Sequence, residues 1–168
     1  MLLALILSSI VSGAIATGLM VLCLYLPLLW NGRYYDTLGA IGAVFTRRND
    51  AQSRVIGAII LLIGGIIFAL FYGFFVLMFE KGPLNIPNYG ILPGWPVKVN
   101  MMYIFLGLAG GLGQGMFMAM ITSFIVADFH PVEAYRDNVT LIMSYIIGHT
   151  IYGIVVMFFQ SQFLQFLT

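Results

Sequence analysis

Three polar side chains that can donate, accept or ligate lie deep inside long apolar stretches of the sequence: Thr17, Gln114 and His149. At about 1.5 Å of rise per residue, each lies about 17–21 Å from the same end of the molecule along its expected helix. The sequence therefore predicts that the three meet at one level of a helical bundle, opposite the glycine pair at 64–65. His149 and Gln114 are the candidate cofactor-binding residues, because an imidazole and an amide can both hold a ligand.

Three kinds of chemistry are open to His149. It could be a neutral imidazole hydrogen-bonded to Gln114, Thr17 or a backbone carbonyl across a close helix contact. It could instead ligate the metal of a haem or chlorin, with Gly148 and Gly153 leaving room for the ring. The third alternative is contact with a quinone or a lipid head group.

The remaining chemistry-bearing residues narrow the function classes. His130 stands beside a proline and among acidic residues, so we expect it to be solvated. It lies about 28 Å from His149 along one helical path, which disfavours a bis-histidine haem. Cys23 is the only cysteine, and no Asp, Glu, Lys or Arg lies within the four apolar stretches. These absences argue against a disulfide, a proton relay and a voltage sensor, so we expect no metal site, no catalytic residue and no enzymatic activity.

Composition sets the class of protein that must position these residues. Of 168 residues, 61% are hydrophobic and 8% are charged, and the mean hydropathy is +1.03. This predicts an all-α membrane protein: one membrane domain over residues 1–168, with spans at about 2–30, 55–79, 100–127 and 139–166. The net charge of +1 argues against a nucleic-acid surface, which needs clustered basic charge. The apolar composition makes membrane lipids the expected surroundings of the chain.

Small residues recur at helical spacing on every predicted span. In the third span Gly107, Gly111, Gly115, Ala119 and Ser123 follow one another at every fourth position. Such spacing strips one helix face down to backbone and allows another helix to approach closely. The sequence thus predicts a four-transmembrane-helix bundle packed through small-xxx-small faces. Its packing positions are Gly13, Gly65, Gly73, Gly107, Gly111, Gly115 and Gly148.

Two connections carry features of their own. Asp36 is placed to cap a short helix whose Leu38, Ile41 and Phe45 share one face. That segment is either an amphipathic helix on the membrane surface or a plain polar connector. The loop at 80–99 holds four prolines, which exclude a regular helix; it is either a rigid docking surface or an interfacial cover.

Basic residues predict the orientation. Cytoplasmic loops are enriched in Lys and Arg, and the first and third connections together hold five of them against two in the second. We therefore expect a bacterial cytoplasmic membrane protein with both termini on the outer side. The residues counted are Arg33, Arg47, Arg48, Arg54 and Arg136 against Lys81 and Lys98.

Four segments resemble a known family. They are "SGAIATGLM", Asp36 followed by "TLGAIGAVF", "GGIIFALFYGFF" and "SYIIGHTIYGIVV". They are similar to small bacterial four-helix integral membrane proteins known only as a domain of unknown function. The resemblance implies a four-helix bundle and no activity. Members often carry a second histidine near the start of the second span, where this chain has Ile63, Gly64 and Gly65.

These observations favour a non-catalytic accessory or structural subunit of a larger membrane complex, such as one of photosynthetic or respiratory electron transfer. Nothing in the sequence resembles an active site, and the small-residue faces suit contact with other integral membrane subunits. The alternative is a pigment-, haem- or quinone-binding module centred on His149. Its cofactor would be a chlorin, haem or quinone, in addition to bound lipids.

Overall fold

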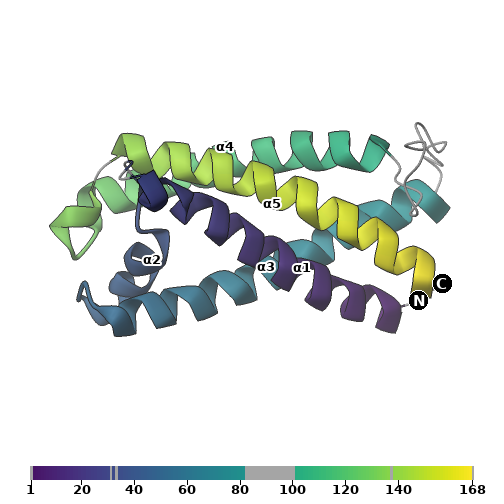
Figure 1. Ribbon diagram of the computed structural model, residues 1–168, viewed down its shortest axis with the longest axis horizontal. Coiled ribbons are helices and arrows are strands. Elements are labelled where there is room, and N and C mark those ends of the chain that lie inside the picture. The colour runs from purple at the N-terminus through teal and green to yellow at the C-terminus, as the bar shows by residue number, and fades with distance from the viewer. Residues whose placement is uncertain (1, 31, 33, 82–100, 137, 168) are drawn as a thin grey trace.

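The computed structural model describes residues 2–30, 32, 34–81, 101–136 and 138–167 (Figure 1). Within these ranges the chain is helical, without strands. Most of the proline-rich loop proposed as a docking surface, with Lys98 and Arg33, lies outside the described residues. The elements are α1 (Leu2–Tyr25), η1 (Leu26–Trp30), α2 (Thr37–Thr46), α3 (Ala51–Lys81), α4 (Met101–Phe129), η2 (Glu133–Tyr135) and α5 (Asn138–Leu167).

Four of these helices are long and apolar enough to cross a membrane, which is typical of a multi-pass membrane protein. The spans run over Leu2–Leu29, Ala51–Phe79, Met101–Val126 and Val139–Phe163. The all-helical architecture with four long apolar helices is therefore confirmed. The second predicted span is helix α3, which starts at Ala51, four residues earlier than predicted. Arg54 therefore lies in the first turn of α3 rather than before it.

The helices form a bundle with one open side. In Figure 1, α4 and α5 run side by side, α1 crosses α3, and both termini lie at the end opposite α2 and η2. α5 contacts α1, α3 and α4, whereas α4 makes extensive contacts with α5 alone among the described elements. The described residues consequently leave the side between α3 and α4 unclosed.

The predicted glycine stripe of α4 faces α5 at close range. A methyl group added at Gly107 would collide with the carbonyl oxygen of Gly153, and one at Gly111 with that of His149. At Gly115 the added carbon would lie 2.9 Å from the Cα of Ile146. The backbones of α4 and α5 are thus too close together for any larger residue at these three positions.

The other predicted packing glycines contact α1, α3 and α5 in different ways. A carbon added at Gly13 would lie 2.9 Å from the Cβ of Ala69, where α1 crosses α3. Gly65 lies against the hydroxyl of Thr17, and Gly148 lies beneath the side chains of Leu24 and Met20. Gly73 leaves space for the amide of Gln160, so here the glycine admits a polar side chain rather than a neighbouring backbone.

That amide belongs to a buried polar cluster near the termini. The Gln160 Nε2 donates to the hydroxyl oxygens of Ser8 and Ser9 at 3.0 Å each, and Ser12 donates to Oε1 at 2.5 Å. All four side chains are buried. A polar side chain in an apolar interior needs such partners, so this cluster fixes α5 against α1.

The first connection forms the short helix α2, so the plain-connector alternative is wrong. Asp36 caps it by accepting a hydrogen bond from the Gly39 N–H at 2.9 Å, as predicted. Its buried face is the small-residue one: a methyl group at Gly42 would strike the Ser53 carbonyl of α3. Of the predicted apolar face, Phe45 is 69% exposed, whereas Leu38 and Ile41 are partly buried. Whether α2 lies along a membrane surface stays a prediction.

Candidate functional site

The polar residues expected at one level line a single cavity of about 230 Å³, bordered by α1, α3, α4 and α5 and by Ile41 of α2. Thr17, Gln114 and His149 border it together with Gly64 and Gly65. Most of the remaining lining is aliphatic or aromatic. The bundle therefore holds an apolar internal space with a few convergent polar groups, which is the usual composition of a small-molecule site.

His149 lines this cavity and keeps one ring nitrogen as a hydrogen-bond acceptor. Its Nδ1 lies 2.9 Å from the carbonyl oxygen of Tyr145, one turn earlier in α5, and its ring stacks on the Tyr145 ring. A carbonyl oxygen can only accept, so Nδ1 carries the proton and Nε2 keeps its lone pair. Among the residues that the structure describes, Nε2 has no hydrogen-bond partner. The expected bond from His149 across to another helix is therefore not formed.

Neither Gln114 nor Thr17 forms a hydrogen bond with His149 in the described part of the chain. Gln114 uses its Oε1 to accept from the Tyr72 hydroxyl of α3 at 3.0 Å. Thr17 is 4% exposed, and its Oγ1 finds no partner within the described part of the chain. An unpaired buried hydroxyl costs about 1–3 kcal/mol, so Thr17 gains stability from any group that bonds to its Oγ1.

An apolar groove adjoins the cavity on the open side of the bundle. It measures about 520 Å³ and lies between α3 and α4. The two spaces share Phe68 and Gln114 as lining residues, so Gln114 stands at their junction. Together they reach the roughly 300–1,000 Å³ that is typical of small-molecule sites.

The predicted room for a haem or chlorin beside His149 is not present. Gly148 is covered, because a carbon added there would lie 3.1 Å from the Leu24 Cδ1. Gly153 lies against the backbone of α4 at Gly107 and Gly111. The prediction that these two glycines leave space for a ring is therefore wrong, and the geometry at His149 favours a smaller head group.

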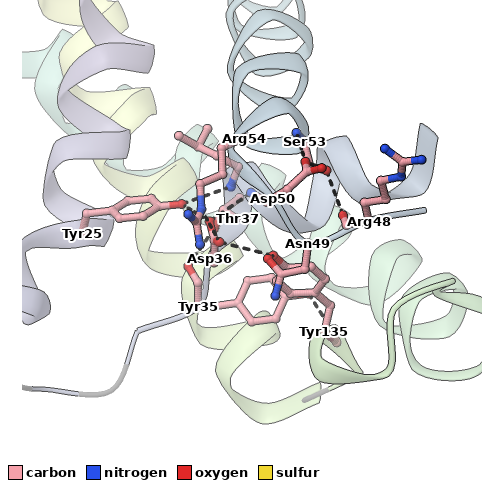
Figure 2. Close-up of polar contacts among 12 residues, drawn as sticks. Tyr25, Tyr35, Asp36, Thr37, Arg48, Asn49, Asp50, Ser53, Arg54 and Tyr135 are labelled. Atoms are coloured by element: carbon pink, nitrogen blue, oxygen red, sulfur yellow. Dashed lines mark hydrogen bonds and ion pairs between the residues drawn. The ribbon is translucent and has the colours of Figure 1, made fainter. Parts of the chain in front are cut away.

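A second polar site lies at the opposite end of the bundle from the termini and is centred on Asp36 (Figure 2). The Asp36 Oδ1 accepts from the Tyr25 hydroxyl at 2.5 Å and from the Gly39 N–H at 2.9 Å. Its Oδ2 pairs with the Arg54 Nε at 2.8 Å and accepts from the Tyr135 hydroxyl at 3.2 Å. One carboxylate thus ties together the end of α1, the start of α2, the first turn of α3 and η2.

The electrostatics fix the protonation of this site at neutral pH. Burial alone would raise the pKa of Asp36, but hydrogen bonds from Tyr25, Gly39 and Arg54 outweigh it and hold the pKa below its usual range. Burial raises the pKa of Tyr135 to about 12, with the charge of Asp36 adding to the effect. Both carboxylate oxygens already accept two contacts each, so we interpret the cluster as a lock between elements.

His130 is buried and is not the solvated residue that its sequence neighbours predicted. It is 2% exposed, its Nδ1 accepts from the Val132 N–H at 3.1 Å, and its Nε2 lies 3.0 Å from the Ala40 carbonyl oxygen. Arg136 donates through Nη2 to the His130 carbonyl at 2.9 Å. His130 thereby fastens the connection between α4 and α5 onto α2.

Sequence analysis missed three of these contacts for different reasons. The sequence predicts only a helix-capping role for Asp36, because Tyr135 lies 99 residues away and nothing local indicates that the two residues pair. The same holds for His130 and Ala40, which are 90 residues apart. Gln160 did carry a signal: it is an amide in an apolar run, and α1 offers three serines on one face.

Comparisons of the chain with protein-family models, with curated proteins and with solved structures found no match. Within the described residues, no three His, Cys, Asp or Glu side chains lie together in a way that could hold a metal ion. The resemblance to the small bacterial four-helix family stays a prediction.

Proposed function

We propose that this chain is a non-catalytic accessory or structural subunit of a larger membrane complex, such as one of photosynthetic or respiratory electron transfer. Its four long helices cross a bacterial cytoplasmic membrane, and its close glycine contacts are the small-residue packing of membrane helices. The length and apolar composition of the helices support the membrane location. The resemblance to small bacterial four-helix membrane proteins supports the same assignment.

The observation that carries the subunit proposal is an exposed glycine on α4 that no described part of the chain contacts. Gly113 of α4 is exposed, and a methyl group added there would meet nothing within 4 Å. Glycine within a helix costs about 1 kcal/mol relative to alanine, so this position has no reason internal to the chain to be glycine. Close approach by a helix of another subunit would supply the reason. Gly18 of α1 is exposed in the same way.

We expect Gly113→Leu to release partner subunits without unfolding the chain. The leucine would fill the notch that a partner helix uses, while the internal contacts of α4 stay as they are. The measurement is purification of the tagged chain from its own membranes in mild detergent, followed by native mass spectrometry. Met116→Leu, on the same exposed face of α4, keeps the side-chain volume and serves as the matched control. A wild-type chain that purifies alone, or partners that persist in Gly113→Leu, would contradict the proposal.

The proposed orientation places both termini outside. The end opposite the termini, where α2 lies (Figure 1), suits the cytoplasmic side under the positive-inside rule. Arg47 and Arg48 follow α2 in the chain, Arg54 lies in the first turn of α3, and Arg136 follows η2. In a Cys23→Ser background, we expect a membrane-impermeant thiol reagent applied to spheroplasts to label a cysteine appended after Thr168. Gln52→Cys should be protected until the membrane is permeabilised. Labelling of Gln52→Cys in intact spheroplasts would reverse the orientation.

A second candidate function is small-molecule binding at His149, and it is compatible with the first. It is favoured by the unpartnered Thr17 hydroxyl and by the free Nε2 of His149 in one cavity. The covered glycines on α5 argue for a quinone-sized or lipid-sized head group over a haem or chlorin.

A further inference from the structure

Two polar side chains that line one cavity each hold an atom without a hydrogen-bond partner among the described residues, and only the Thr17 Oγ1 is fully buried. The Thr17 Oγ1 comes from α1 and the His149 Nε2 from α5, and both residues line the 230 Å³ space. Most buried polar side-chain atoms in folded proteins are hydrogen-bonded. A single guest in this cavity could satisfy both atoms at once.

The Thr17 Oγ1 and the His149 Nε2 determine which hydrogen-bonding groups the bound molecule must have. The His149 Nε2 can only accept, so the guest needs a hydrogen-bond donor such as a hydroxyl group. Thr17 can donate or accept, and Gln114, whose Oε1 is occupied by Tyr72, has N–H groups that can donate to a second oxygen. A charged head is disfavoured, because none of the described residues that line the cavity is an Asp, Glu, Lys or Arg that could neutralise it.

The adjoining groove suits an apolar tail. Four phenylalanines of α3 line it, Phe68, Phe71, Phe75 and Phe79, facing Leu106 and Gly110 of α4. Gln114 marks the point where the polar end gives way to the apolar one. Because α3 and α4 are not closed against each other, a molecule dissolved in the bilayer could enter the groove sideways.

We propose that the cavity binds the head of a quinol, a hydroxyl-bearing ring with a second oxygen, whose apolar tail lies in the groove between α3 and α4. The His149 Nε2 accepts a hydrogen bond from a hydroxyl group of the ring, and Thr17 and Gln114 complete the polar contacts. An oxidised quinone has only acceptor oxygens and leaves Nε2 unpaired. The site therefore prefers the reduced form. The inference rests on the proposed membrane location but needs no partner subunit.

The test measures binding of three probes to the purified full-length chain in nanodiscs: a decyl-substituted hydroquinone, the corresponding quinone and decylbenzene. We expect the hydroquinone to bind about tenfold more tightly than the quinone, as for one hydrogen bond to a buried group. Decylbenzene should bind more weakly than either. His149→Phe, which keeps a ring but removes the acceptor, should abolish the preference for the reduced probe.

Thr17 provides a control that separates binding from folding. Thr17→Val removes an unpaired hydroxyl at nearly constant shape, so the melting temperature of the ligand-free chain should rise. The same substitution should weaken hydroquinone binding about tenfold, whereas Thr17→Ser should bind like the wild type. Equal affinity for the three probes would overturn the proposal, and so would a Thr17→Val chain that is less stable but binds unchanged. Because the assay contains one purified chain, its failure would leave the Gly113 test of partner binding unaffected.

Discussion

Gly111→Leu should abolish the folded bundle, whereas Gly113→Leu, two residues along the same helix, should leave it intact. At Gly111 an added carbon already meets the His149 carbonyl and the Thr150 Cα, which are backbone atoms that cannot rotate away. Overpacking against adaptable side chains costs about 1–3 kcal/mol, and a backbone obstacle allows less relief. Because α4 is held mainly by α5, the expected loss approaches the roughly 5–15 kcal/mol total stability of a typical domain.

The measurement is size-exclusion chromatography and thermal unfolding of both variants in the same detergent. Gly111→Leu should aggregate or elute as an expanded species, and Gly113→Leu should match the wild type in elution and melting temperature. A well-folded Gly111→Leu chain would mean that α4 and α5 do not meet through this glycine.

The second large effect is expected at Asp36. Asp36→Ala should destabilise the chain by about 2–4 kcal/mol, from the lost helix cap and from the Tyr25 hydroxyl left without its acceptor. Arg54 adds little, because its side chain is 50% exposed and solvent screens the ion pair. Asp50→Ala is the matched control: Asp50 caps α3 by accepting from the Ser53 N–H but is not bonded to another helix, so its loss should be smaller.

Asp36 also predicts a pH dependence of stability. Its folded-state pKa lies below the unfolded value of about 3.9, so its contribution is complete above that pH. As the pH falls through the folded pKa, the carboxylate gains a proton and the contribution disappears. The melting temperature of the wild type should therefore fall below about pH 4, and that of Asp36→Asn should fall less. Identical acid profiles for the two chains would show that Asp36 is not the group responsible.

The contrast between correct and failed predictions has a physical cause. Each long helix is specified locally, because a run of apolar residues determines its length and class without reference to other segments. The cap at Asp36 is local in the same sense. The prediction that His130 is solvated was wrong because its burial depends on Ala40. Ala40 lies on a distant helix and has no distinctive chemistry. The prediction of space for a ring near His149 was wrong because Leu24, the side chain that covers Gly148, belongs to another helix, α1.

Predicting a shared level for Thr17, Gln114 and His149 required only helix rise and a common membrane frame. Predicting which of them would bond to which required the rotation of each helix about its own axis. Gln114 turns toward Tyr72 and His149 bonds within its own helix, so neither choice follows from depth alone. Depth along a helix is therefore readable from sequence in this chain, and side-chain pairing is not.

The hydrogen bonds of Gln160 also bear on how the chain is made. They join α5 to Ser12 and Ser8, which precede it by 148 and 152 residues. A ribosome delivers α1 first, so its serines and the notch at Gly73 wait for their partner until α5 has been synthesised. The buried serines of α1 therefore gain these hydrogen bonds only after α5 has been made and packed against α1.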